Sequence, residues 1–294
     1  MLVSVFGATG NTGKEVCKSL SGMKDVRIRA MTRESSRAKE LPVHEVIQVE
    51  WTNRPQLRSA LVGVDAAYFM LPTGLYNGSL YEFRNAYSRA FIEIANEVGL
   101  KRLVHLSSFG AHLAERSGVL KGLYRAERNL EDFKGELAII RPGYFWQNFL
   151  GNIAAIRENG FFGGYPVDPD VHLLLADTSD IGEAAAQLLT AQTMPNHRVS
   201  HVGNPQLVTF REVSRMIADK SGRKELEWTN LGYEAARSHM LGRKMPEEIV
   251  DNLIEFFEAI NSGRAMGDYA PARLIATKTG IAEFTTWFAG QITE

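Results

Sequence analysis

Gly7-Ala8-Thr9-Gly10-Asn11-Thr12-Gly13 is the stretch that decides the fold of this chain. It follows the apolar run Leu2–Phe6 and precedes residues 14–20, which have a helix-like pattern. A strand, a glycine turn and a helix in this order are typical of a dinucleotide-binding unit, where the first glycine turns sharply, the second leaves room for phosphate and the third lets the helix pack closely. The helix N-terminus presents free N–H groups and a partial positive charge to the pyrophosphate. The alternative is a purely structural turn in another βα unit.

Composition limits the classes of protein to consider. With 294 residues, 45% of them apolar and 23% charged, the chain can bury a large core in one domain plus an extension, or in two domains. A net charge of -1 argues against a direct nucleic-acid partner. No signal peptide and no apolar run of roughly 18 residues is present, so we expect a cytoplasmic protein without a membrane partner. The single cysteine, Cys17, excludes a disulfide framework, and we expect it to pack against the sheet.

Strand and helix patterns alternate through the first half of the chain. Apolar runs predict strands at residues 26–31, 44–49, 66–71, 102–106 and 137–140, and helical spacing predicts helices at 52–62 and 80–98. We expect Ser35 or Ser36 to cap a helix between the second and third strands. This alternation predicts an α/β fold with a doubly wound parallel sheet, whose ligands gather at the C-terminal ends of the strands.

The pattern changes after about residue 150 and becomes mostly helical. We expect Thr178 to cap a helix that reaches Leu189, residues 199–202 to form a strand, Thr209 and Glu212 to form a capping box, and residues 246–260 to form a helix. The glycines at 160, 163 and 164 predict a loop whose aromatic neighbours Phe161, Phe162 and Tyr165 line a flat pocket. We therefore predict a dinucleotide-binding domain at 1–150 and a smaller substrate-binding lobe at 151–294, with 177–204 packing back on the first domain.

The end of the second predicted strand bears on the choice of cofactor. An NAD-preferring site carries an acidic residue about 20 residues past the glycines, whereas this chain has Thr32 and Arg33 there. A guanidinium suits a 2′-phosphate, and Arg37 and Lys39 add positive charge. The pattern favours NADP(H) over NAD(H). Arg33 could instead be solvated or stack on adenine, and Glu50 is either an acceptor for the adenine amino group or a solvated carboxylate.

Several motifs together resemble the NmrA-like family, an atypical branch of the short-chain dehydrogenase/reductases. They are the glycine turn, Thr32-Arg33, Ser107-Ser108, the run Arg141-Pro142-Gly143-Tyr144-Phe145-Trp146-Gln147-Asn148, Asp177–Ile181, Thr279-Gly280 and Thr285–Phe288. The run that begins with Arg141 is the most specific of them. The resemblance covers nearly the whole chain and implies a Rossmann-type domain that binds NADP(H), with a small C-terminal lobe. Members of the family include quinone and azo-dye reductases and redox-sensing regulators.

The turn, the strand ends and this resemblance give a set of expected binding residues. The cofactor residues are Gly7, Thr9, Gly10, Asn11, Thr12, Gly13, Thr32, Arg33, Glu50, Met70, Leu71, Pro72, Thr73, Pro142, Gly143 and Tyr144. Phe145 and Asn148 are expected at the substrate. Metal binding by His197 and His201 is disfavoured, because four residues of strand separate their Cα atoms by roughly 13 Å.

The catalytic residues are less well defined by the sequence. Tyr124 and Arg128 have the spacing of the tyrosine and lysine that short-chain reductases use for proton transfer, but arginine does not deprotonate. Leu123 stands where many NmrA-like proteins carry a histidine ahead of Glu127. Tyr124 is therefore a catalytic candidate or a surface tyrosine. Ser107 is a candidate for contacting a substrate carbonyl or for satisfying backbone groups at the strand end.

These residues favour a reductase that transfers hydride from NADPH to a conjugated small-molecule acceptor such as a quinone, because such an acceptor needs little acid catalysis. The alternative is an NADP(H)-sensing regulatory protein without turnover. A sugar-nucleotide epimerase is a third reading, but the tyrosine-lysine pair it would use is missing. The protein partners compatible with this interpretation are a second copy of the chain and a regulatory protein.

Overall fold

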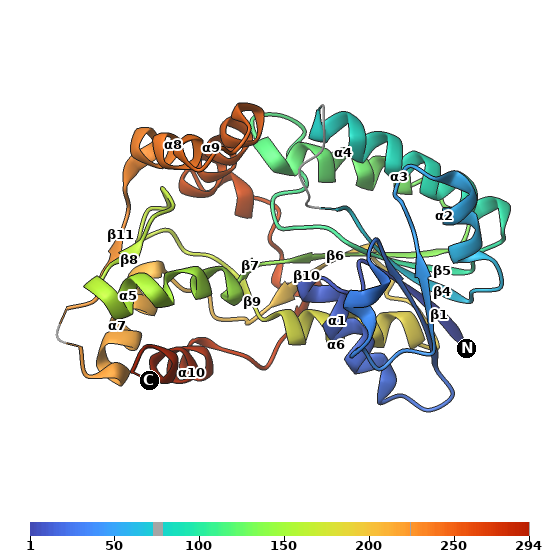
Figure 1. The fold of residues 1–294 in the computed structure, drawn as a ribbon, viewed down its shortest axis with the longest axis horizontal. Helices are drawn as coiled ribbons and strands as arrows, with labels where there is room; N and C mark the ends of the chain where they lie inside the picture. Colours follow the sequence, from blue (N-terminus) through green and yellow to red (C-terminus); the bar gives the residue numbers. More distant parts are fainter. Residues whose placement is uncertain (73–78, 224, 294) are drawn as a thin grey trace.

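The computed structural model describes residues 1–72, 79–223 and 225–293. Its centre is a parallel sheet of eight strands in the order β12-β10-β6-β5-β4-β1-β2-β3, which confirms the predicted doubly wound α/β fold (Figure 1). The strands of this sheet are β1 (Leu2–Phe6), β2 (Arg27–Thr32), β3 (Glu45–Gln48), β4 (Ala66–Met70), β5 (Arg102–Leu106), β6 (Glu136–Pro142), β10 (Val199–Gly203) and β12 (Leu274–Ala276).

Helices cover both faces of the sheet (Figure 1). One face packs against α2 (Arg54–Leu61), α3 (Leu80–Glu97) and α4 (Lys121–Leu130), and the other against α1 (Asn11–Ser21) and α6 (Thr178–Thr190). The position of β4 between the two layers of helices explains why its sequence is apolar throughout. Phe69 belongs to the first core and Tyr68 to the second, because alternate side chains of a strand point to opposite faces.

The segment between β2 and β3 differs from the prediction. It contains a short 3-10 helix, η1 (Ser35–Ala38), and no α-helix, so the expected cap at Ser35 or Ser36 is wrong. Glu34 occupies the position before the turn, and its backbone N–H donates to Thr32 Oγ1 at 3.2 Å. The Thr32 hydroxyl thus forms a local turn at the strand end, as Ser and Thr side chains often do where a helix does not start.

The start of α6 also differs from the prediction in one residue. The capping residue is Asp177, whose carboxylate accepts from Ser179 N at 2.8 Å, whereas Thr178 is the first residue inside the helix and is buried. An aspartate at this position is stabilised by the positive end of the helix. The capping box at Thr209 and Glu212 is confirmed, and the helix it begins, α7, ends before Gly222.

A second cluster of helices, which we call the C-terminal lobe, packs around an aromatic core beside the sheet (Figure 1). Trp146, Phe149, Phe210 and Trp228 meet there, with the Phe149 and Phe210 ring centroids 4.9 Å apart. The elements of this part are β7 (Tyr144–Phe145), η3 (Trp146–Asn152), α5 (Ile153–Asn159), β8 (Phe162–Gly163), α7 (Phe210–Ser221), β11 (Trp228–Thr229), α8 (Gly232–Gly242), α9 (Glu247–Asn261) and α10 (Ile281–Thr293).

The chain after residue 150 also returns to the central sheet. Strand β10 confirms the strand predicted at 199–202 and pairs with β6. Strand β12 pairs with β10 and extends the sheet by a strand that the sequence did not indicate. The remaining elements are β9 (Leu175–Ala176), which pairs with β7, and the short helices η2 (Gly118–Leu120), η4 (Arg264–Met266) and η5 (Pro271–Arg273). Within the described ranges, no helix has the length and apolarity that a membrane crossing requires.

Candidate functional site

The glycine turn between β1 and α1 has the geometry of a phosphate cradle. Gly7 has φ +70, and its carbonyl accepts from Gly10 N at 2.9 Å. A Cβ on Gly13 would lie 2.1 Å from Gly7 O, so only glycine fits at the first turn of α1. Gly10 caps the helix without a side-chain hydrogen bond, which leaves the first N–H groups of α1 free to bind an anion.

A cleft of about 650 Å³ opens at this turn and runs along the C-terminal ends of β1, β2 and β4. Most of the predicted cofactor residues line it. They are Gly7, Thr9, Gly10, Asn11, Thr32, Arg33, Glu50, Met70 and Pro72. Glu34, Arg37 and Trp51 complete the lining, and of these the sequence reading named only Arg37, for its charge.

Other predicted cofactor residues do not line this cleft. Thr12 is buried and accepts a hydrogen bond from Tyr68 Oη at 3.0 Å, Gly13 packs against the turn, and Leu71 is buried in the core. Gly143 is enclosed, because a Cβ there would lie 2.1 Å from Leu174 O. Pro142 is buried at the end of β6, and Thr73 lies outside the described residues.

Charges of both signs meet where the ribose and its 2′ substituent would lie. Arg33 and Arg37 supply cations, but Glu34 also lines the cleft, which corrects the prediction that no carboxylate stands at this point. Glu34 Oε2 lies 3.9 Å from Arg37 Nε, and both side chains are mostly exposed. The Arg37 guanidinium partly offsets the negative charge of the Glu34 carboxylate.

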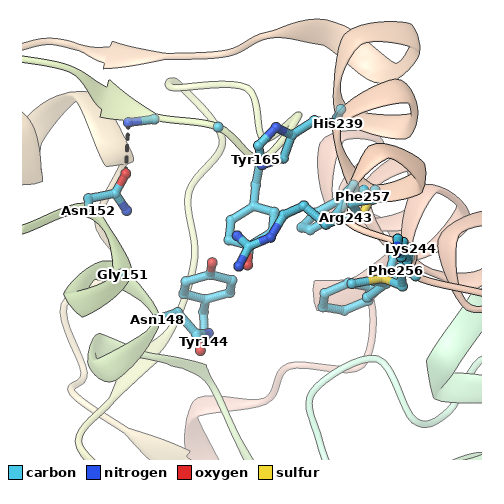
Figure 2. A pocket seen from close by; sticks show the side chains of 16 residues that line it. Tyr144, Asn148, Gly151, Asn152, Tyr165, His239, Arg243, Lys244, Phe256 and Phe257 are labelled. Atoms are coloured by element: carbon cyan, nitrogen blue, oxygen red, sulfur yellow. Dashed lines mark hydrogen bonds between the residues drawn. The ribbon is translucent and has the colours of Figure 1, made fainter. Parts of the chain in front are cut away.

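A second cavity of about 700 Å³ lies between the segment after β6 and the helices α8 and α9 (Figure 2). Tyr144, Asn148 and Tyr165 face it from one side, and apolar side chains of α8 and α9 face it from the other. Asn148 is hydrogen-bonded to the Tyr144 hydroxyl, and burial raises the pKa of that hydroxyl above its usual range. We call this cavity the acceptor pocket. It holds the predicted substrate residue Asn148 and the cofactor candidate Tyr144.

The other aromatic residues expected at the substrate lie elsewhere. Phe145 packs among the apolar residues on the α1 and α6 face of the sheet, and Phe162 is buried in the core of the C-terminal lobe. Of the loop aromatics, Tyr165 alone is among the residues that line the acceptor pocket, together with Gly163 and Gly164. Residues of α8 contribute a wall that the sequence did not reveal, because no helix was predicted at residues 232–242.

A buried network of charged groups joins the sheet to the C-terminal lobe. Arg141 on β6 donates to both carboxylate oxygens of Glu127 on α4 and to Asp268, which follows η4. His112 Nδ1 lies 2.8 Å from Asp268 Oδ1, and His201 Nε2 lies 3.5 Å from Oδ2. Burial alone would raise the pKa of Asp268, but the two histidines and the arginine outweigh it and hold the pKa at about 2.

Of the two catalytic candidates from the sequence, Ser107 contacts this network and Tyr124 lies outside it. Ser107, at the end of β5, donates its hydroxyl proton to Glu127 Oε1 at 2.5 Å. Tyr124 on α4 lines neither the cofactor cleft nor the acceptor pocket, and the Arg128 guanidinium lies 5.8 Å from its ring centroid. Throughout residues 1–72, 79–223 and 225–293, no cluster of three His, Cys, Asp or Glu side chains is arranged to hold a metal ion.

Comparison with known proteins identifies the family of this chain. A model of the NmrA-like family matches residues 1–285 of the chain. The chain belongs to the NmrA-like family. This confirms the resemblance that the run beginning at Arg141 indicated.

Two curated relatives are similar over most of the chain. An NAD(P)H azoreductase of Xenophilus azovorans is 29% identical over 260 residues, which are 87% of this chain and 86% of that protein. A (4-alkanoyl-5-oxo-2,5-dihydrofuran-3-yl)methyl phosphate reductase of Streptomyces griseus is 26% identical over 98% of this chain and 97% of its own length. The Escherichia coli NADPH-dependent quinone oxidoreductase, solved with NADPH, has the same fold, with a TM-score of 0.78, 20% identity and coverage of 98% and 99%.

Proposed function

We propose that this NmrA-like chain is an NADPH-dependent reductase that transfers hydride to a conjugated acceptor such as a quinone. One observation carries the proposal: a dinucleotide cleft and an apolar pocket open at the same, C-terminal edge of one parallel sheet. Met70 and Pro72 end the cleft at β4, and Tyr144 begins the pocket after β6. Strand β5 lies between β4 and β6, so a cofactor in the cleft would extend across its end towards Tyr144.

The residues of the cleft fit a phosphorylated dinucleotide. The free N–H groups at the start of α1 would bind the pyrophosphate, and Arg33 with Arg37 would bind the 2′-phosphate that distinguishes NADP from NAD. Glu50 would accept from the adenine amino group. When bound, the reduced nicotinamide supplies the hydride.

The groups that could donate a proton to the substrate suit a conjugated acceptor better than a simple ketone. The Ser107 hydroxyl is committed to Glu127, and Tyr124 lies away from both cavities. Burial keeps the Tyr144 hydroxyl protonated, so it can donate a hydrogen bond to an acceptor oxygen without losing its proton. Reduction of a quinone gives a comparatively stable anion that can take its proton from water, so the site needs no tyrosine-lysine pair. Ser107 and Tyr124 stay catalytic candidates within this proposal.

Stopped-flow mixing tests the proposal directly. NADPH-loaded protein is mixed with a panel of quinones, and the loss of reduced-nicotinamide absorbance is followed. We expect oxidation that saturates with quinone concentration. Tight NADPH binding with oxidation no faster than in buffer would refute the reductase and favour the NADP(H)-sensing alternative, because sensing needs the cleft but not the pocket.

A further inference from the structure

The charged side chains of the acceptor pocket all have one sign. Arg243 and Lys244 line it, His239 adds a nitrogen donor, and among its described lining residues there is no aspartate or glutamate. The chain as a whole has a net charge of -1, with 34 acidic residues, so this positive wall is a local feature. Figure 2 shows Arg243 reaching from α8 into the pocket, towards the side that carries Tyr144 and Tyr165.

The basic side chains of this pocket are not held in ion pairs with the protein. In the parts of the chain that the structure describes, Arg243, Lys244 and His239 form no ion pair and no side-chain hydrogen bond. Arg237, nearly two turns before Arg243 on α8, differs, because it binds both Glu247 and Asp251 at 2.7 and 3.0 Å. Glu247 and Asp251 on α9 therefore pair with Arg237 and not with Arg243 or Lys244, which stay available for a ligand.

The backbone holds one of these cations in an unusual conformation. Lys244 follows α8 with φ +60, the left-handed region where glycine is usual at the end of a helix. Its N–H donates to Leu241 O at 2.8 Å, and Met245 N donates to Met240 O at 3.2 Å, which closes the turn to α9. The turn thus places two consecutive basic residues at the pocket. The second of them, Lys244, stands at a position where a glycine would be less strained.

The rest of the pocket is suited to a flat apolar body. Phe256 and Phe257 on α9 and Tyr165 after β8 contribute aromatic rings to the lining, and the Tyr165 and Phe257 rings stack on each other with centroids 5.3 Å apart. Met240, Met245 and Leu253 complete the apolar lining. A guanidinium binds phosphate, sulfonate or carboxylate oxygens in pairs, and an ammonium adds a point charge.

We propose that the acceptor carries an anionic group on its conjugated body, and that Arg243 and Lys244 bind this group while the aromatic rings hold the body. The inference rests on the proposed reductase function and names the class of its acceptor. The competing explanation is that both cations only stabilise the C-terminal end of α8 through its dipole. In that case their removal would change stability and not the choice of acceptor.

The test compares naphthoquinone with a naphthoquinone sulfonate whose sulfonate is on the benzenoid ring. The protein is saturated with cofactor, so that the anion does not bind in the phosphate cradle. Calorimetry on the NADP⁺-loaded protein gives binding of each quinone, and NADPH oxidation gives kcat/KM. For the double variant Arg243→Gln/Lys244→Gly, we expect the sulfonate-to-neutral ratio of both quantities to fall about tenfold or more. The control Arg237→Gln should leave both ratios as in the natural chain.

The two measurements separate the two proposals. An unchanged binding ratio in the double variant, or a fall as large in the Arg237→Gln control, would overturn the anionic-acceptor subsite. A binding ratio that falls as expected, with no NADPH oxidation by either quinone, would support the anion subsite and refute the reductase function. Loss of thermal stability with an unchanged ratio would favour the helix-dipole explanation.

Discussion

The cofactor cleft and the acceptor pocket are built in different ways. The cleft is built from the first 72 residues, and its central part is backbone, namely the turn at Gly7 and the free N–H groups of α1. The pocket is assembled from two stretches far apart in the sequence, 144–165 and 236–257, and its polar part consists of side chains. We infer that the cleft tolerates little change while the pocket can change its acceptor by substitution. This contrast fits a family whose members are named for different acceptors.

The largest effect is expected from the network that links the two regions. Arg141→Met leaves the fully buried Glu127 carboxylate without its partner and also removes a contact to Asp268. Removing one member of a buried ion pair costs about 3–5 kcal/mol. Urea unfolding should show this loss, whereas Arg54→Gln, at an exposed pair with Glu93, should cost at most about 1 kcal/mol. Similar losses in the two variants would show that the network does not hold the regions together.

The glycine turn gives the next largest effect. Gly13→Val puts a side chain 2.1 Å from Gly7 O, and the backbone must move to admit it. We expect about 3 kcal/mol of destabilisation and no measurable NADPH binding. The control is Gly22→Ala at the other end of α1, where φ is -80 and a Cβ would make an ordinary contact 3.7 Å from Ser19 O. NADPH binding by the valine variant at the natural affinity would contradict the backbone account of the cleft.

The sequence predicted the parts of the fold that local chemistry determines. The turn at Gly7 and the capping box at Thr209 each depend on residues a few positions apart, so both were found. Strand β12 is only three residues long and forms because β10 offers a free edge, which no local pattern shows. Glu34 was missed as a cleft residue because only Thr32 and Arg33 were expected at the end of the strand, although Glu34 follows them directly.

The same limit applies to the candidate site. Ser107, Glu127 and Asp268 are separated by up to 161 positions and meet only after the sheet and the C-terminal lobe have packed. The charge of Arg243 was visible in the sequence, but its position in a pocket depends on α8. That helix was not predicted, because its eleven residues begin and end at glycines and have a weak apolar pattern. Long-range packing, rather than local propensity, therefore decides where the acceptor pocket forms.

We expect His105, on β5, to make the stability of the protein depend on pH. Burial lowers the pKa of His105 from 6.5 to about 4, and its Nδ1 lies 3.1 Å from Phe69 O. The unfolded chain binds a proton at this residue near pH 6.5 and the folded chain only near pH 4, so the unfolded state gains protons first as the pH falls. Stability should be highest above pH 6.5 and should fall by up to about 3 kcal/mol towards pH 4.

Unfolding measured across this pH range checks the expectation. His105→Gln should flatten the dependence, whereas the exposed control His172→Gln should keep the natural slope. An equally steep profile for the His105 variant would assign the pH dependence to other groups, with Asp268 contributing only at much lower pH because its pKa is about 2.

Cofactor choice should respond to the charges at the end of β2. Arg33→Ala is expected to weaken NADPH binding about tenfold or more and NADH binding much less, because only NADPH offers a phosphate to the guanidinium. Glu34→Gln should tighten NADPH binding by a smaller factor, since it removes a carboxylate from the same cleft. Fluorescence titration with both cofactors measures the two effects, with Arg27→Ala at the opposite end of β2 as control. Equal losses for NADPH and NADH would remove Arg33 from the phosphate site.

The smallest effect concerns the strained residue of the acceptor pocket. Lys244→Gly relieves the strain of the left-handed conformation at φ +60. The greater freedom of glycine in the unfolded chain offsets part of this gain, so the free energy of unfolding should rise by about 0.5 kcal/mol. Lys244→Ala removes the same charge and keeps the strain, so it should give no such gain. Thermal unfolding of the pair separates strain from charge. Suppose that Lys244→Gly raises the stability of the protein and that both variants lose their preference for an anionic acceptor. The charge of Lys244 then comes at a cost in stability. The glycines of the cofactor cleft differ, because they serve both the fold and the ligand.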